Sequence, residues 1–328
     1  MQWILLLCAL VSTTSPSTAP TNRSASVLVV TGAQGTPEYG RDFAKWADHW
    51  RDAANTSSVT FLEVGRTPTA GQPDKQRLRE LLASESKSRQ PLWLILIGHG
   101  TFDGHDAKFN LRDDDISAQE LSELLQDVKR PTAVVCCFSA SSPFLNALSA
   151  PDRIVITATR SGSEHQFSRF GDFLSASIAD ASADLDKDGQ TSLLEAFLAA
   201  SHRTEEFYKQ ESRLATEHAL LDDNGDKLGI PADWFQGIRA TRSAKEGAAL
   251  DGLRAHQWHL VESAGDRSFS AKAREQRDEL EFQIEALRQK KAALNEKDYY
   301  AQLEKLLIQL SRLYAESPAS TRPAPSVK

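Results

Sequence analysis

Residues 92–100 read LWLILIGHG, and this stretch decides the fold because a run of six apolar residues ends abruptly in Gly-His-Gly. Unbroken apolarity, in place of alternation, predicts a strand that is covered on both faces. The glycines on either side of His99 let the backbone approach a ligand closely and leave an amide beside the imidazole. An imidazole that titrates near neutral pH is suited to act as a general base. The stretch therefore predicts a buried strand with a candidate site at its carboxyl end.

Four other apolar runs share this character: residues 26–31 (SVLVVT), 59–64 (VTFLEV), 132–138 (TAVVCCF) and 153–159 (RIVITAT). Segments with helical periodicity lie between them, at residues 39–54, 74–84 and 117–128. Strands that alternate with helices predict an α/β fold, with a mostly parallel sheet and helices on both faces. Ligands of such sheets bind beyond the carboxyl ends of the strands, so the loops after residues 97 and 138 are where we expect the chemistry.

The second of these loops offers candidate nucleophiles. The run TAVVCCF is followed by small hydroxyl residues, Ser139-Ala140-Ser141-Ser142, so Cys137 and Ser139 both lie near the end of a predicted strand. Both can share a sheet edge with His99. The alternative is that Cys136 and Cys137 are small core residues, which is a common role of free cysteine.

These strand ends resemble those of the caspase, legumain and gingipain group of cysteine peptidases. In that group a hydrophobic strand ends in His-Gly, and a second strand ends in Cys with Ser-Gly or Gly after it; the resemblance covers residues 26–235. It implies a caspase-like fold and an endopeptidase that cleaves a peptide or protein substrate through an acyl-enzyme. Carried over to this chain, His99 is the general base, Gly100 supplies an oxyanion amide, and Cys137 or Ser139 is the nucleophile.

The nucleophile motif departs from the pattern of the group and fits in two registers. The sequence Cys-x-Ser-Gly falls either on Cys137-Phe138-Ser139-Ala140 or on Ser139-Ala140-Ser141-Ser142, where serine replaces cysteine. A hydroxyl needs a stronger and better aligned base than a thiol, so a serine in a site built for cysteine is expected to be slow or inactive. The competing hypothesis is therefore a catalytically inactive caspase-like protein that acts as a calcium-stabilised binding or scaffold module.

Charged residues after other strands are candidates for substrate contacts. Arg160 and Glu164 follow the fifth run, where the peptidase group has substrate-binding loops, and either side chain can read a substrate charge. A solvated turn is the alternative for this segment. Asp103, His105 and Asp106 follow the His-Gly turn, where we favour a surface loop over a role in orienting His99.

Residues 184–195 (DLDKDGQTSLLE) match the EF-hand calcium-loop pattern at every ligand position. The expected ligands are the carboxylates of Asp184, Asp186 and Asp188, the backbone carbonyl of Gln190, the hydroxyl of Ser192 or a water, and both oxygens of Glu195. Helical stretches flank the loop at residues 170–179 and 193–207. A second acidic segment, Asp222-Asp223-Asn224-Gly225-Asp226, resembles an incomplete loop that ends at Asp233 and has Lys227 in place of the sixth-position glycine; we expect a turn there before a metal site.

Composition and the two ends of the chain complete the prediction. A net charge of −7 without a Lys/Arg cluster disfavours nucleic acid as a partner. The apolar run in residues 3–11 predicts a signal peptide at 1–19 and export of the protein to the periplasm or medium, with a buried first strand as the alternative. We expect no transmembrane helix in the mature chain. We expect an α/β domain at 25–245, a helical region at 246–317 that ends in an antiparallel hairpin, and a disordered tail at 318–328. The hairpin is expected to pack on the domain, with a dimerisation or protein-partner surface as the alternative. Its first helix has an apolar face and so does its second, formed by Leu280, Ile284, Leu287 and Leu294 and by Tyr300, Leu303, Leu307, Leu310 and Tyr314.

Overall fold

The structure is a computed structural model that describes residues 25–57, 59–68, 71–246 and 248–316. The predicted signal peptide, its alternative as a buried strand and the predicted tail lie outside the described residues.

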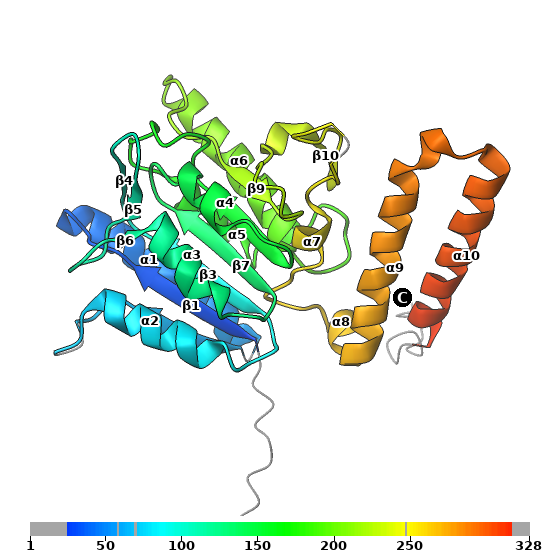
Figure 1. Cartoon of the computed structure of the whole chain (residues 1–328), viewed down its shortest axis with the longest axis horizontal. Helices are drawn as coiled ribbons and strands as arrows, with labels where there is room; N and C mark the ends of the chain where they lie inside the picture. Colours follow the sequence, from blue (N-terminus) through cyan, green and yellow to red (C-terminus); the bar gives the residue numbers. More distant parts are fainter. Residues whose placement is uncertain (1–24, 58, 69–70, 247, 317–328) are drawn as a thin grey trace, which may run out of the picture.

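A six-stranded sheet forms the centre of the molecule (Figure 1). Its strands run in the order β2 (Thr60–Val64), β1 (Ser26–Thr31), β3 (Leu92–Ile97), β7 (Thr132–Cys137), β8 (Arg153–Thr157) and β9 (Leu220–Asp222). The first four neighbouring pairs are parallel, and only β9 runs antiparallel to β8. The five predicted apolar runs form the five parallel strands. The sixth strand has three residues, which is too short to show a periodicity in the sequence.

Helices cover both faces of this sheet, as predicted. Along β3, Trp93, Ile95 and Ile97 face one core and the alternate leucines face the other, because successive side chains of a strand point to opposite sides. The first core is closed by α1 (Pro37–Thr56), α5 (Phe170–Ser177) and α6 (Leu193–Gln210). The second is closed by α2 (Asp74–Glu85), α3 (Ala118–Gln126) and α4 (Ser142–Leu148). The α/β fold class is therefore confirmed.

Shorter elements that were not predicted fill the connections. A three-stranded antiparallel sheet, β4 (Gly100–Phe102), β5 (Ala107–Phe109) and β6 (Ile116–Ser117), follows His99 directly. The hairpin β10 (Phe235–Gln236) and β11 (Arg239–Ala240), the 3-10 turns η1 (Ala181–Ala183) and η2 (Ala232–Trp234), and the short helices α7 (Leu253–His256) and α8 (Ala264–Arg267) lie in the later part of the chain.

Two long helices, α9 (Ala271–Gln289) and α10 (Glu296–Ala315), form the C-terminal hairpin that extends from one side of the body (Figure 1). A 3-10 turn, η3 (Lys291–Ala293), joins them. Ile284 and Leu287 of α9 are buried as the spacing predicts. The predicted apolar face of α10 is corrected by the structure: Tyr299 is buried, whereas Tyr300, Leu307 and Tyr314 are exposed.

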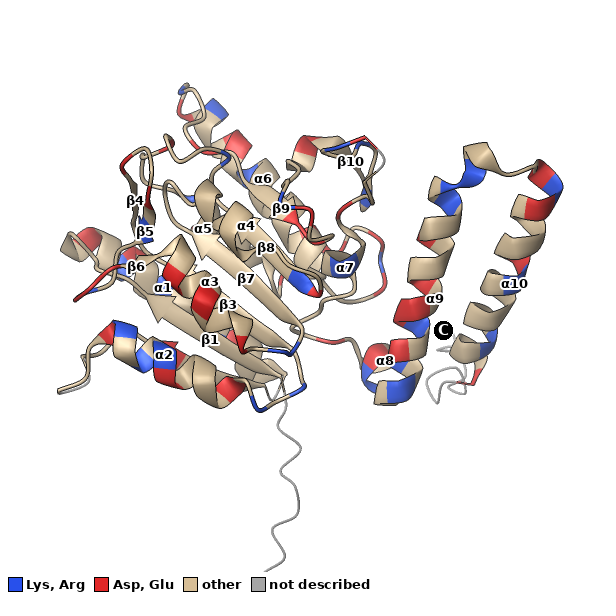
Figure 2. Cartoon of the chain, viewed as in Figure 1, with Lys and Arg blue, Asp and Glu red and all other residues tan. Residues whose placement is uncertain are grey.

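Acidic and basic residues are interspersed along α2, α9 and α10 (Figure 2). Among the described residues, no helix is both long enough and apolar enough to cross a lipid bilayer.

Candidate active site

His99 lies between β3 and β4, at the carboxyl end of the sheet. Its Nε2 is 3.3 Å from the backbone carbonyl of Gln34, which can only accept, so Nε2 donates and Nδ1 keeps the lone pair. The rings of Tyr39 and Phe43 from α1 approach the imidazole edge to face, at centroid distances of 5.0 and 5.1 Å. Burial lowers the pKa of His99 below its ordinary value, against the opposing effect of the Gln34 carbonyl. Among the described residues no hydrogen bond reaches Nδ1, so this half-buried imidazole, whose charged form burial disfavours, can accept a proton there.

The strand register brings Ser139 level with His99. Ile97, the last residue of β3, pairs with Cys137, the last residue of β7. His99 and Ser139 each lie two residues beyond these strand ends. The Ser139 hydroxyl donates to the carbonyl of Gly100 over 3.3 Å. A Cβ on Gly100 would lie 2.3 Å from the Ser139 carbonyl oxygen and 2.4 Å from the Phe138 ring, so only glycine fits. The two predicted strand tips therefore meet, and glycine is what allows their contact.

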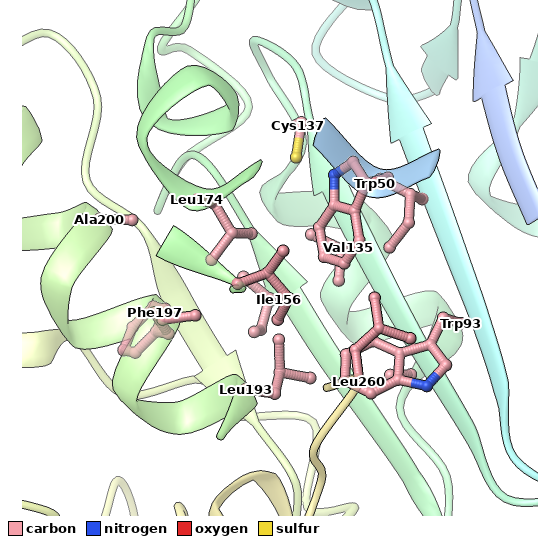
Figure 3. Close-up of a cluster of buried hydrophobic side chains, with 14 of the residues drawn as sticks. Trp50, Trp93, Val135, Cys137, Ile156, Leu174, Leu193, Phe197, Ala200 and Leu260 are labelled. Carbon is pink, nitrogen blue, oxygen red and sulfur yellow. The ribbon is translucent and has the colours of Figure 1, made fainter. Parts of the chain in front are cut away.

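Cys137 is a core residue in this structure. It is 1% exposed and belongs to the core between the sheet and α1, where Figure 3 shows it beside Trp50 and Val135. A Cβ on Gly171 would lie 2.7 Å from the Cys137 Cβ and 2.8 Å from the Trp46 ring, so no free space surrounds the thiol on that side. Burial raises the pKa of the Cys137 thiol. Ionisation of the thiol is therefore disfavoured, and the thiol lies in the same buried cluster as Trp46 and Trp50.

Cys136 faces the opposite core and is fully buried, with its pKa raised by burial. The two cysteines are free, as the sequence predicts for neighbours on a strand. Within the part of the chain that the structure describes, no hydrogen bond joins His99 to Cys137 or Ser139. The base and its candidate nucleophiles are neighbours in register and are not linked as a dyad.

Ala140 follows with a left-handed backbone (φ 55°). This conformation favours glycine, so Ala140 fits the glycine position of the Cys-x-Ser-Gly motif when that motif is placed on Cys137. The Ala140 amide donates to the backbone carbonyl of Glu164 over 2.8 Å and so ties the loop after β7 to the loop after β8. Backbone conformation thus supports the Cys137 register, whereas alignment with His99 supports Ser139.

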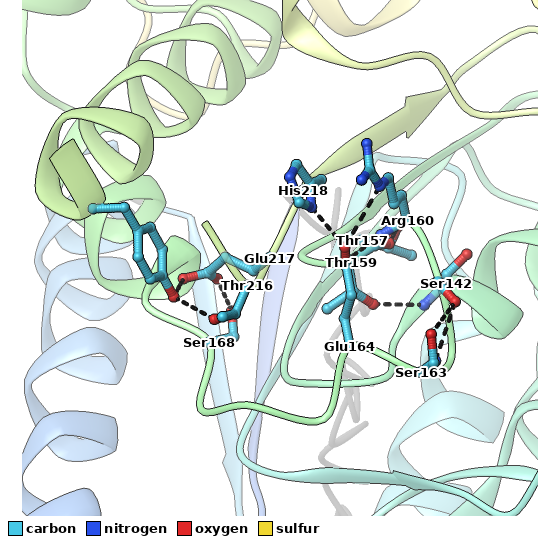
Figure 4. A network of polar contacts seen from close by, with 12 residues as sticks. Ser142, Thr157, Thr159, Arg160, Ser163, Glu164, Ser168, Thr216, Glu217 and His218 are labelled. Atoms are coloured by element: carbon cyan, nitrogen blue, oxygen red, sulfur yellow. Dashed lines mark hydrogen bonds and ion pairs between the residues drawn. The ribbon is translucent and has the colours of Figure 1, made fainter. Parts of the chain in front are cut away.

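Glu164 and Arg160, the two predicted substrate contacts, differ in how far their side chains are exposed to solvent (Figure 4). The Glu164 carboxylate accepts from the Arg160 amide over 2.9 Å and meets His218 Nδ1 at 2.6 Å, and its side chain is 13% exposed. Glu164 therefore acts inside the protein as an organiser of this loop. The Arg160 side chain is 61% exposed and lies 3.6 Å from the Glu164 carboxylate through its Nε, so a substrate charge would share it with that ion pair. His218 was missed in the sequence because it lies 54 residues from its partner.

The loop after β4 is a surface turn, as we favoured. Asp103 accepts hydrogen bonds from the amides of His105 and Asp106, at 2.8 and 2.7 Å, and all three residues are exposed.

The predicted calcium loop has its three aspartates close together. Oxygens of Asp184, Asp186 and Asp188 lie within 4.8 Å of one another, and Gly189 has the positive φ (87°) that a sharp turn requires. Burial raises the pKa of Asp186, and the neighbouring charges of Asp188 and Glu195 add to the effect. Carboxylates that crowd together in this way are the hard oxygen donors that calcium prefers.

Glu195 closes the same loop from the first turn of α6. It is fully buried, and its Oε1 accepts from the amides of Leu185 and Asp186, at 2.7 and 3.3 Å. Its Oε2 accepts from the amide and the hydroxyl of Ser192, which is also the N-cap of α6. Glu195 and Ser192 therefore have a helix-capping role in addition to their predicted role as ligands.

Two contacts near this loop were not predicted. Gln190 accepts at its side-chain oxygen from the Ser263 amide over 2.9 Å, and His256 Nε2 lies 3.4 Å from Asp186 Oδ2. Both partners come from the segment before the hairpin, more than sixty residues away, and no local pattern could indicate them. The loop is thus a docking point for the later part of the chain.

A cavity of about 1350 Å³ lies at the other end of the sheet. Its lining includes Pro91 and Pro131, which precede β3 and β7, and residues of α9 such as Arg277. It is therefore distant from His99, which lies beyond the carboxyl ends of the same strands.

Solved structures that are similar to this chain include two insect caspases. The initiator caspase Dronc of Drosophila is 15% identical, with 65% of this chain and 84% of that chain covered and a TM-score of 0.43. Caspase-1 from Spodoptera frugiperda is 8% identical, with 62% and 86% covered and a TM-score of 0.38. Raptor from Chaetomium thermophilum is 10% identical, with 47% and 17% covered and a TM-score of 0.34. No protein-family model matches the chain, and no curated protein matches its sequence.

Proposed function

We propose that this protein is a caspase-like module that binds a peptide or protein segment at the tips of β3 and β7 and lacks thiol catalysis. One observation carries the proposal: Cys137, the only described thiol near His99, is 1% exposed within the core. A cysteine peptidase attacks with a thiolate, and burial opposes ionisation of this thiol. His99 and the exposed Arg160 remain available beside the strand tips, where they can contact a bound chain.

Serine-type hydrolysis at Ser139 is the second candidate, and the strand register favours it. In that reaction His99 Nδ1 takes the hydroxyl proton and Ser139 Oγ attacks the scissile carbonyl. The imidazole then returns the proton to the leaving nitrogen as the C–N bond breaks, which gives an acyl-enzyme and a free amine. The hydroxyl instead donates to the Gly100 carbonyl, which directs its proton away from the imidazole. We therefore rank binding above hydrolysis.

Incubation of the full chain with calcium and a peptide library, read by mass spectrometry, tests both candidates. The variants are His99→Ala, Cys137→Ala and Ser139→Ala, with circular dichroism as the control for folding. We expect no cleavage by any form. Binding is measured separately by fluorescence anisotropy of labelled acidic peptides, which Arg160→Ala should bind more weakly than the wild-type protein does; equal binding by the two would count against the proposed binding site. Cleavage that is lost in His99→Ala and Cys137→Ala would overturn the proposal in favour of a thiol peptidase. Cleavage that is lost in His99→Ala and Ser139→Ala, and kept in Cys137→Ala, would establish the serine reaction.

A structural calcium ion at residues 184–195 is part of the same proposal. Its support is the close approach of the three aspartates and the buried Glu195. The ion would neutralise these carboxylates and hold the loop against the segment that carries Ser263 and His256. In an exported protein, extracellular calcium would keep such a site filled.

We also propose that α10 binds a protein partner. Its support is the exposure of Tyr300, Leu307 and Ile308 along one helix. Exposed apolar side chains that gather on one element are typical of an interaction surface.

A further inference from the structure

The loop that follows β9, residues 222–228, has the same internal hydrogen bonds as the start of the first calcium loop. We count seven positions, from Asp222 at the first to Leu228 at the seventh. The amides of positions four and six donate to the two carboxylate oxygens of Asp222, at 2.9 and 3.2 Å. The amide of position five donates to Asn224, and that of position seven to Asp226, both at 2.8 Å.

In the first loop the corresponding bonds run between the same positions. The amides of positions four and six donate to Asp184 at 2.7 and 3.1 Å, that of position five to Asp186 at 3.2 Å, and that of position seven to Asp188 at 3.0 Å. Positive φ angles occur at positions four and six of both loops: 64° and 87° in the first, 80° and 70° in the second. Lys227 therefore adopts the backbone for which the sequence argument required glycine.

The closing carboxylate of the second loop comes from a distant residue. In the first loop, Glu195 Oε1 accepts from the amides of positions two and three. In the second, Asp251 Oδ1 accepts from the amides of Asp223 and Asn224, which hold those same positions, at 3.0 and 3.2 Å. Asp233, which the sequence suggested for this role, is exposed in η2 and takes no such part. The residue that closes this loop is therefore Asp251.

An observation independent of the loop geometry concerns two buried carboxylate oxygens. Asp251 is 3% exposed, and its second oxygen, Oδ2, is buried without a hydrogen-bond partner. Oδ2 of Asp226 is also buried without a partner. Among the described residues, neither carboxylate forms an ion pair with a basic side chain. A buried carboxylate oxygen that lacks both a hydrogen bond and a countercharge is costly, and a bound cation removes that cost.

We propose that Asp222, Asn224, Asp226 and Asp251 form a second calcium site whose carboxylates draw together on binding, because among the described residues only the three aspartates of the first loop already have oxygens within 4.8 Å of one another. The donor set consists of carboxylate and amide oxygens without histidine or cysteine, which suits a hard cation. The ion would fasten the segment around Asp251 to the edge of the sheet. The carboxylate of Asp223 accepts there from the amides of Gly252 and Ala255, at 2.9 and 2.8 Å. Both calcium sites would thus hold the chain that leads to the C-terminal hairpin.

Calcium binding to the full chain, after treatment with a chelator and gel filtration, tests the proposal by isothermal titration calorimetry and metal analysis. The wild-type protein should bind two calcium ions per chain. Asp251→Asn and Asp226→Asn should each bind one, and the matched control Asp233→Asn should bind two. Asp188→Asn should lose the ion of the first loop and keep the second, which separates the two sites.

Equal stoichiometry in the wild-type protein, Asp251→Asn and Asp226→Asn would overturn the second site, whatever the first loop does. Two substitutions on different segments protect the test against a variant that fails to fold. Thermal unfolding with and without calcium provides a second readout: Asp251→Asn should show a smaller calcium-induced rise in Tm than Asp233→Asn. An equal rise in both variants would also count against the site.

Discussion

At the scale of single residues, the position of a side chain relative to the sheet decides what it can do. Cys137 is the last residue of β7, and His99 lies two residues beyond the end of β3. The thiol nevertheless belongs to the core, whereas the imidazole lies at the edge of the sheet. The tip of β7 carries a hydroxyl, Ser139, and its hydrogen bond runs to Gly100. This geometry agrees with the proposed binding role, because among the described residues no hydrogen bond links the imidazole to Cys137 or Ser139.

The pKa of His99 provides a prediction for this residue. Burial lowers its pKa, so the neutral imidazole should persist below pH 6.5, and less than half of His99 should be protonated at that pH. Histidine NMR titration of the full chain measures this, with His99→Ala to assign the resonance. A midpoint above 6.5 would show that a negative charge, rather than burial, governs the site.

Gly100 provides a second prediction. In Gly100→Ala the new methyl group meets the Ser139 carbonyl and the Phe138 ring, so the strand tips must separate. We expect a loss of about 1–3 kcal/mol in the free energy of unfolding, measured with urea. Gly265→Ala is the matched control, because its nearest neighbour would lie 3.6 Å away. Equal stabilities of the two variants would mean that the tips do not touch as described.

At the scale of elements, a buried ion pair joins α2 to the turn before β7. The Arg130 side chain is 0% exposed and lies 2.5 Å from the Glu85 carboxylate, and it also donates to the carbonyl of Pro91 before β3. These hydrogen bonds, with that from the Thr132 hydroxyl to the Arg130 carbonyl, satisfy backbone carbonyls where β3 and β7 begin. It fixes α2 against the sheet at the end opposite His99.

Removal of one member of this ion pair should lower the free energy of unfolding. Glu85→Ala removes the carboxylate beside the buried Arg130 guanidinium, and we expect a loss of about 3–5 kcal/mol in the free energy of unfolding. Glu80→Ala, on the exposed face of the same helix, should change it by less than about 0.5 kcal/mol. A small effect of Glu85→Ala in urea unfolding would mean that water reaches Arg130.

The sequence predicts elements well where the signal is local. Unbroken apolar runs identified the five parallel strands. The spacing of acidic residues predicts a calcium loop at residues 184–195, and this stays a prediction. Contacts between distant segments were not predicted, because neither periodicity nor a motif links Glu164 with His218 or Asn224 with Asp251. The sequence also left open whether the Cys137 side chain faces the core or the site, because this depends on which residue of β7 is the last to be buried.

At the scale of the whole molecule, the proposed binding site and the proposed calcium sites occupy different regions. The strand tips with His99 lie at the carboxyl edge of the parallel strands. The two acidic loops instead hold residues 249–263, which lead to α8 and the C-terminal hairpin (Figure 1). Calcium is therefore expected to act on the attachment of the later chain, and peptide binding on the β3 and β7 tips.

The most direct test of this account is thiol labelling of the native full chain with iodoacetamide at pH 8 in calcium, mapped by tandem mass spectrometry. Peptide mapping separates Cys8 from the two core cysteines. The account predicts that Cys136 and Cys137 stay unmodified in the folded protein and react fully after denaturation. Rapid modification of Cys137 in the native protein, lost in His99→Ala, would contradict it, because that result requires an accessible thiolate activated by the imidazole.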